Sequence, residues 1–140
     1  SRKAMAVLPL VSKEAIIIGA DTICTLGGKI INKPVDDDDA RRIITQACKM
    51  RLQRVITGVC IIDARDMTTL GFSETSLVEM KPASAAEIDA YVKTGEPMGK
   101  AGALAIESAS GFVASFEGSY ANIMGLPIER VLPILMRLDV

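Results

Sequence analysis

Apolar residues are gathered in a few dense blocks along the chain. Residues 15–18 and 53–63 are apolar almost without interruption, which is typical of strands buried on both faces. Residues 70–81 form a second, more polar strand, and we expect them to pair with 53–63 as a long hairpin. Gly27 and Gly28 separate two further apolar stretches and favour a two-residue hairpin turn.

Other segments carry apolar residues at helical spacing. Residues 36–50 have an apolar stripe opposite arginine and lysine side chains, and Asp36 is the predicted N-cap of this helix. Ser84 and Glu87 have the spacing of a capping box, which starts another helix. We expect two more helices at 1–13 and 127–138, each with a proline that ends or kinks it, and short strands at 104–107 and 112–116.

Strands and helices alternate along the 140 residues, a length sufficient for one domain with its own core. Aromatic residues make up only 4% of the chain, so the core must be aliphatic. We therefore predict an α/β protein with a mixed β-sheet flanked by helices, and a single domain that covers residues 1–140.

Composition and charge exclude several classes of protein. Apolar residues make up 49% of the chain, which argues against disorder, and the net charge of −1 gives no general attraction to nucleic acid or membrane. The longest apolar runs are far shorter than the roughly 20 residues of a membrane-spanning helix. No signal peptide is visible in the sequence. We predict a cytoplasmic protein with neither nucleic acid nor membrane as a partner.

The metal-binding and nucleophilic residues of the chain are few. It contains no histidine, which excludes the common zinc sites and any triad that depends on an imidazole. Its three cysteines are Cys24, Cys48 and Cys60, without a Cys-x-x-Cys spacing. We expect all three to be reduced core residues.

Asp21 follows the first apolar run, where the strand is expected to leave the core. The predicted hairpin folds Lys33 back toward Asp21. A carboxylate and an ammonium group at the mouth of a sheet suit a polyphosphate with a divalent cation. In such a site the carboxylate binds the metal or activates water, and the lysine binds phosphate. A structural ion pair is the alternative interpretation.

Other charged residues also allow two interpretations. The four aspartates at 36–39 resemble a metal site, but we favour a capped helix whose positive N-terminus attracts them. Lys3 is typical of a solvated helix lysine, and Glu107 ends an apolar run as Asp21 does, or is a surface residue. Lys100 lies in the glycine-rich loop 96–103, which is either a mobile connection or a backbone that approaches a ligand.

Six segments, in order, carry a resemblance to a known family. They are Ile-Gly-Ala-Asp-Thr at 18–22, Asn-Lys-Pro at 32–34, Ile-Thr-Gly-Val at 56–59, Tyr-Val-Lys-Thr-Gly-Glu-Pro at 91–97, Gly-Lys-Ala-Gly-Ala at 99–103 and Glu-Gly-Ser-Tyr-Ala-Asn-Ile-Met-Gly-Leu-Pro at 117–127. The chain resembles the Maf family of nucleoside-triphosphate pyrophosphatases, and the segments cover nearly all of its length.

The resemblance implies a fold shared with inosine-triphosphate pyrophosphatases, with a central cleft. It also implies hydrolysis of a modified or non-canonical nucleoside triphosphate to the monophosphate and pyrophosphate, with Mg²⁺ or Mn²⁺. Asp21 matches the catalytic base and metal-associated carboxylate, and Lys33 matches the phosphate-binding lysine. We assign substrate binding to Lys3, Thr22, Lys100 and Glu107.

Two departures from the family pattern affect these expectations. An N-terminal loop, whose arginines and hydroxyls hold the triphosphate, has no counterpart before Lys3, so we expect the chain to be N-terminally incomplete relative to the family. Glu107 replaces a glutamine, which leaves the base open between a pyrimidine and 7-methylguanine. The alternatives are a non-enzymatic regulatory protein linked to septum formation, or an inactive fragment of the enzyme. The oligomeric state is open, and a homodimer is one option.

Overall fold

The computed structural model describes residues 1–107 and 111–138. Its helices are α1 (Arg2–Val7), the 3₁₀ turn η1 (Leu8–Leu10), α2 (Asp37–Met50), α3 (Ala85–Val92), the 3₁₀ turn η2 (Ala101–Ala103), α4 (Tyr120–Ile123) and α5 (Ile128–Arg137). Its strands are β1 (Ile16–Leu26), β2 (Lys29–Ile31), β3 (Leu52–Asp63), β4 (Thr69–Met80) and β5 (Val113–Glu117).

The strands form one sheet in the order β2-β1-β3-β4-β5. Gly27 and Gly28 join β1 to β2 with φ values of 54° and 79°, which suits a tight turn, and Leu26 pairs with Lys29 in antiparallel register. β4 and β5 are antiparallel too. The predicted α/β class, with helices flanking a sheet, is confirmed. The prediction of a mixed sheet is wrong: the sheet is antiparallel, because short turns and not crossover helices join β1 to β2 and β3 to β4.

Most predicted elements are confirmed, and two segments differ from the prediction. The side chain of Asp36 accepts a hydrogen bond from Asp39 N, which starts α2, and Ser84 and Glu87 form the predicted capping box of α3. Residues 104–107 are not the expected strand, because the chain enters them from η2 and turns at 106–107. α5 continues through Pro133, so this proline does not end the helix.

The chain forms two compact units. The first unit contains Ser1–Thr22, Ile56–Thr75 and Ser119–Val140, and the second contains Ile23–Val55 and Ser76–Gly118. Because the boundaries fall inside β1, β3 and β4, each of these strands contributes residues to both units.

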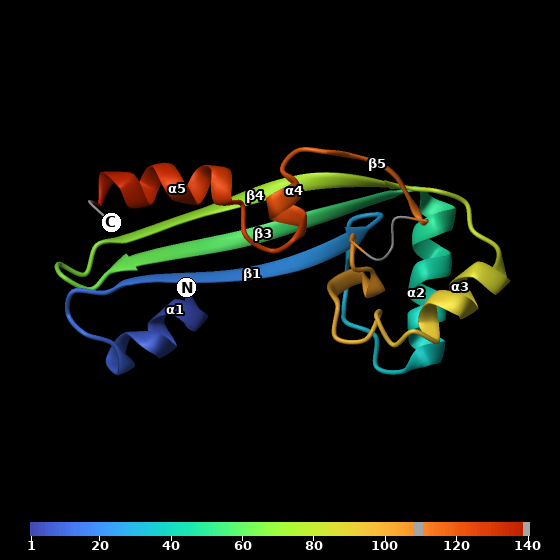
Figure 1. The fold of residues 1–140 in the computed structure, drawn as a ribbon, viewed down its shortest axis with the longest axis horizontal. Coiled ribbons are helices and arrows are strands. Elements are labelled where there is room, and N and C mark those ends of the chain that lie inside the picture. Colours follow the sequence, from blue (N-terminus) through green and yellow to red (C-terminus); the bar gives the residue numbers. More distant parts are fainter. Residues whose placement is uncertain (108–110, 139–140) are drawn as a thin grey trace. The chain divides into compact units, whose positions relative to one another are not determined.

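In the first unit, helices cover both faces of the strands (Figure 1). α1 packs on one face, where Ala4 is buried against Ile17, Cys60 and Ile62. On the other face, Val131 of α5 lies in a cluster with Val59 and Ile61, joined by partly buried residues that include Ile16, Ala20 and Phe72. Within the part of β1 that belongs to this unit, odd-numbered residues therefore face α1 and even-numbered residues face α5, as strand alternation requires.

The second unit is built around α2. The predicted apolar stripe of this helix is buried at Ala40, Ile43, Ile44, Ala47 and Cys48. α3 packs beside α2, and Arg41 of α2 forms an ion pair with Asp89 of α3. Tyr91 stacks at a tilt on Phe112, with 5.3 Å between ring centroids, and its hydroxyl oxygen accepts a hydrogen bond from Ala105 N.

All three cysteines are buried free thiols, as the sequence predicts. Burial raises the pKa of Cys24 to about 11, so this thiol stays protonated at neutral pH and is a poor nucleophile. Burial also raises the pKa of Cys48. The cysteines thus act as small core residues.

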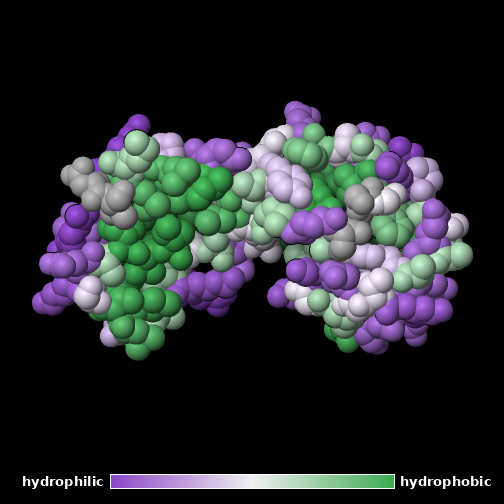
Figure 2. Space-filling view, viewed as in Figure 1, coloured by the Kyte–Doolittle hydropathy of each residue, from purple (hydrophilic) through white to green (hydrophobic). Residues whose placement is uncertain are grey.

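Apolar side chains gather on the surface of the first unit, where Figure 2 shows a broad hydrophobic face. The exposed apolar residues of this unit include Met5, Ile18, Leu132 and Met136. Surfaces of this kind are typical of contacts with other molecules, and a homodimer stays a prediction. Among the described residues, no helix is long and apolar enough to cross a membrane.

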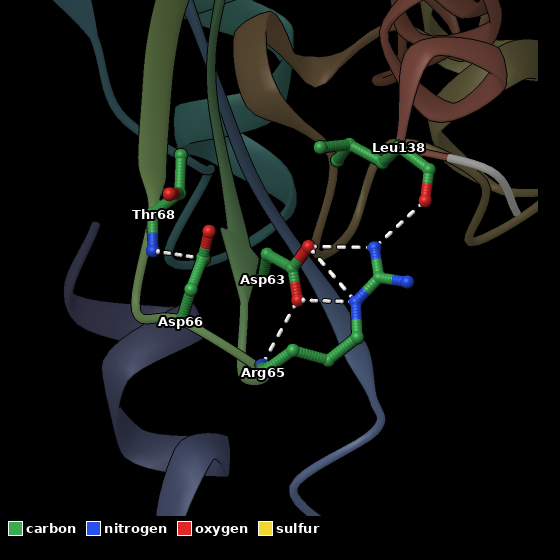
Figure 3. Close-up of polar contacts among 5 residues, drawn as sticks. All are labelled: Asp63, Arg65, Asp66, Thr68 and Leu138. Atoms are coloured by element: carbon green, nitrogen blue, oxygen red, sulfur yellow. Dashed lines mark hydrogen bonds and ion pairs between the residues drawn. The ribbon is translucent and has the colours of Figure 1, made fainter.

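An ion pair between Arg65 and the buried carboxylate of Asp63 closes the turn between β3 and β4 (Figure 3). Asp63 is 4% exposed and accepts hydrogen bonds from Arg65 Nε at 2.9 Å and Arg65 Nη2 at 2.7 Å. Arg65 Nη2 also donates to the carbonyl oxygen of Leu138 at 2.7 Å, just after α5. Its bonds to Asp63 hold the pKa of that carboxyl below the ordinary value. One guanidinium group thereby ties the hairpin turn to the end of α5.

Replacing Arg65 with alanine should lower the melting temperature at neutral pH, because it leaves a buried carboxylate without its cation. The lowered pKa of Asp63 means that this contact stabilises the fold above the ordinary carboxyl pKa of about 3.9 and is lost as pH falls through the folded-state value. The difference in melting temperature between wild type and Arg65→Ala should therefore narrow on acidification. Differential scanning fluorimetry measures both, and Arg54→Ala, at an exposed arginine of β3, is the control. An equal difference at every pH would contradict this role.

Candidate functional site

The sequence predicts Asp21 at the end of a strand, but the structure places it near the middle of β1. The sequence prediction was wrong because the apolar run stops at Ile18, whereas backbone pairing continues to Leu26. Asp21 is consequently held by extended backbone on both sides, yet its side chain is 72% exposed. A rigidly mounted, accessible carboxylate can meet a ligand from solvent.

The side chain of Asp21 faces α1 and forms an ion pair with Lys3. Lys3 Nζ lies 2.6 Å from Asp21 Oδ1, and it donates a second hydrogen bond to the carbonyl oxygen of Ala20 at 3.1 Å. The Lys3 side chain is 65% exposed. The structure thus brings together two of the predicted site residues in one solvent-facing pair.

The position of Lys3 depends on how closely α1 approaches β1. Gly19 of β1 lies directly under Ala4, and a Cβ atom added at Gly19 would stand 2.8 Å from the backbone nitrogen of Ala4. Ala4 is 1% exposed and packs against Ile17, Cys60 and Ile62. Glycine is therefore required at position 19 for the helix to lie this near, and the packing fixes Lys3 beside Asp21.

Thr22, a predicted substrate-binding residue, follows Asp21 in the chain, but the structure places its side chain on the opposite face of the sheet. Consecutive residues of a strand point to opposite sides, so Thr22 faces the side of α5 while Asp21 faces α1. Thr22 Oγ1 lies 2.8 Å from Thr57 Oγ1, and Thr57 Oγ1 donates to the carbonyl oxygen of Asn122 at 3.1 Å. A hydroxyl has one hydrogen, so Thr22 must be the donor to Thr57.

This chain of hydrogen bonds ties the segment with α4 to the strands. Thr57 and Asn122 are both fully buried, and Asn122 N donates a hydrogen bond to Ser119 Oγ, which caps α4. A Cβ atom added at Gly125 would lie 3.5 Å from Thr22 Oγ1, so the segment passes close over Thr22. The sequence analysis gave Thr57 and Asn122 no role, although both lie in segments that carry the family resemblance, at 56–59 and 117–127.

Lys33 lies in the second unit, at the rim of a hollow of about 420 Å³ between β2 and α2. The walls of the hollow are lined by polar and apolar side chains, including Lys29, Asp39, Arg42 and Ile43. Arg42 and Asp39 form an ion pair at 2.6 Å. The hydrogen bond from Arg42 holds the pKa of Asp39 below the ordinary value. Within the described residues, no salt bridge joins Lys29 or Lys33 to a carboxylate. The two lysines give the hollow a positive charge that suits an anionic group.

Lys100 and Glu107 also lie in the second unit, and both are exposed. Lys100 precedes η2, whose Gly102 has a φ of 71° and leaves no room for a Cβ atom against the amide of Gln53. Glu107 sits in a turn and not at a strand end. The prediction that Glu107, like Asp21, follows directly after a strand is therefore wrong, although both carboxylates are exposed to solvent.

Comparison with known proteins adds independent information. The family model described as Maf-like protein matches residues 1–138. A dTTP/UTP pyrophosphatase of Pelotomaculum thermopropionicum is 39% identical over 97% of this chain and 71% of its own length. A dTTP/UTP pyrophosphatase of Dictyoglomus thermophilum is 42% identical over 90% of this chain and 65% of its own length.

A third relative, the dTTP/UTP pyrophosphatase of Shewanella sp., is 41% identical over 96% of this chain and 70% of its own length. The chain thus spans about two thirds of the length of the relatives it matches. Because the family model covers nearly every residue and these identities extend over most of the chain, it belongs to the Maf-like protein family.

Proposed function

We propose that this chain is a nucleoside-triphosphate pyrophosphohydrolase. The observation that carries the proposal is the exposed Asp21 carboxylate, fixed in the middle of β1 with the Lys3 ammonium group at 2.6 Å. Relatives that are 38–43% identical are named dTTP/UTP pyrophosphatases, which supports this reaction class. The sequence motifs around Asp21 and Lys33 point to the same chemistry.

In the proposed reaction, water attacks the α-phosphorus of the nucleotide, and the bond between this phosphorus and the bridging oxygen breaks. The products are the nucleoside monophosphate and pyrophosphate. Asp21 accepts a proton from the attacking water, a role that requires an accessible carboxylate. Lys3 and Lys33 bind phosphate oxygens and offset the negative charge that develops on the leaving pyrophosphate.

Asp21 is also the residue that would hold a divalent cation, Mg²⁺ or Mn²⁺. Residues 1–107 and 111–138 contain no group of three histidine, cysteine or carboxylate side chains able to hold a metal ion. A single carboxylate still fits Mg²⁺, which is commonly bound by one or two carboxylates, with substrate phosphates and water as the other ligands. When bound, the cation supplies positive charge that polarises the phosphate group.

We further propose that the substrate carries a pyrimidine base, as in dTTP and UTP. The names of the relatives support this choice over 7-methylguanine. The N3–H group of uracil or thymine is a hydrogen-bond donor, and the exposed Glu107 carboxylate is able to accept from it. In this proposal Glu107 recognises the base, while Lys100 binds phosphate from the neighbouring loop.

The Asp21→Asn variant should lose pyrophosphate release from dTTP and UTP by at least about a hundredfold, the low end of typical losses for a general base. Asparagine keeps the shape of the side chain but cannot accept the proton. The measurement is a coupled pyrophosphate assay with Mg²⁺ or Mn²⁺, and circular dichroism shows whether the fold is kept. Normal turnover by Asp21→Asn would remove the carboxylate from the mechanism.

The Glu107→Gln variant should raise the ratio of kcat/KM for UTP over 7-methyl-GTP, by about fivefold for one hydrogen bond. Glutamine accepts from N3–H and also donates to a pyrimidine carbonyl, whereas it loses the charge that attracts a cationic purine. Glu14→Gln, at an exposed glutamate outside the proposed site, is the matched control. The control should leave the ratio of kcat/KM unchanged. If Glu107→Gln also leaves this ratio unchanged, Glu107 does not recognise the base.

The Thr22→Val variant should lower the free energy of unfolding by about 1 kcal/mol, because Thr57 loses its hydrogen-bond donor. Thr22→Ser retains the hydroxyl and should stay close to wild type. Urea denaturation followed by circular dichroism measures both. Unchanged stability combined with a large rise in KM would instead return Thr22 to the substrate-binding residues.

A further inference from the structure

The ion pair between Lys3 and Asp21 occupies the carboxylate on which the proposed function depends. Lys3 Nζ donates to both Asp21 Oδ1 and the carbonyl oxygen of Ala20, so two of its three hydrogens are used. A cation that approaches Asp21 therefore meets an ammonium group already in contact with the carboxylate. Positive charges repel, so the pair weakens binding of a free metal ion.

Packing of α1 on β1 holds the main chain of Lys3 beside Asp21. α1 cannot drift away from β1 without losing the contact between Ala4 and the strand at Gly19, where the added Cβ would be only 2.8 Å from Ala4 N. Ala4 is buried with Ile17, Cys60 and Ile62. Lys3 is anchored at its backbone while its side chain remains free to swing into solvent.

The same pair is easy to exchange. Both side chains are largely exposed, at 65% for Lys3 and 72% for Asp21, and exposed ion pairs are weak in water. A triphosphate offers the ammonium group several anionic oxygens in place of one carboxylate. When Lys3 moves to phosphate, Asp21 regains an oxygen for another ligand.

We propose that Lys3 blocks Asp21 in the free protein, and that the site accepts a divalent cation only together with a nucleotide. The phosphates of the metal–nucleotide complex take Lys3, and Asp21 then meets the cation that the same complex carries. Free metal ion has no group to offer Lys3 and binds only weakly. This inference rests on the proposed function, since it names the metal–nucleotide complex as the form of the substrate that the site recognises.

The test is direct binding of Mn²⁺, followed by electron paramagnetic resonance. Wild type should bind Mn²⁺ weakly when the ion is alone, and much more tightly with α,β-methylene-dTTP, which is not hydrolysed between these phosphates. Lys3→Met should tighten the binding of Mn²⁺ alone by about fivefold, the effect of one nearby charge in water. The same variant should weaken the binding of the analogue.

Three further variants separate charge from position. Lys3→Arg keeps the positive charge and should behave as wild type toward Mn²⁺ alone. Lys13→Met removes a charge from an exposed lysine elsewhere in the first unit and should change nothing. Gly19→Ala forces α1 away from β1 and should reproduce the tighter Mn²⁺ binding without removing a charge, with circular dichroism as the check on folding.

Equal affinity of wild type and Lys3→Met for Mn²⁺ alone would overturn the proposed exchange of Lys3 from Asp21 to phosphate. Equally tight binding of Mn²⁺ by wild type with and without the analogue would also overturn it. Pyrophosphate release separates this outcome from a failure of the proposed function. Hydrolysis by wild type with no effect of Lys3 on Mn²⁺ binding leaves the function and removes the exchange. The expected Mn²⁺ behaviour without pyrophosphate release keeps the exchange and removes the proposed reaction.

Discussion

The close approach of α1 to the backbone of β1 at Gly19 is the constraint on which the candidate site depends. The helix can lie this near only because position 19 has no side chain, and the contact buries Ala4 almost completely. Lys3 is one residue earlier in the same helix, so a packing contact between backbones decides where its ammonium group can reach. An electrostatic feature of the surface thus follows from a steric feature of the core.

Strand alternation then sorts the chemistry of the first unit onto two faces. Asp21 and Thr22 are neighbours in sequence, yet one contacts Lys3 and the other contacts Thr57. The face of Asp21 is open to solvent and carries charge, whereas the hydrogen bonds of Thr22 lead into a buried network that ends at Asn122. One face of β1 is therefore available for a ligand, and the other holds the fold together.

Two ion pairs of the first unit show how burial determines what a carboxylate can do. The Asp63 side chain is 5% exposed and held by several bonds from Arg65, so it has a structural role in the turn. The Asp21 side chain is 72% exposed, so solvent and ligands can compete for it. In the low dielectric of the interior an unpaired charge is costly, whereas at the surface water replaces a lost partner.

The sequence by itself determined the α/β class, the glycine hairpin, the capped helices and the buried cysteines, because these depend on local periodicity and turn chemistry. Tertiary structure decided that Asp21 lies inside a strand, that Thr22 points away from it, and that Lys3 contacts it. Residues 104–107 turn instead of extending, although their apolar pattern allows a strand. These outcomes depend on which surfaces meet across long sequence separations, and a pattern along one chain carries no information about such contacts.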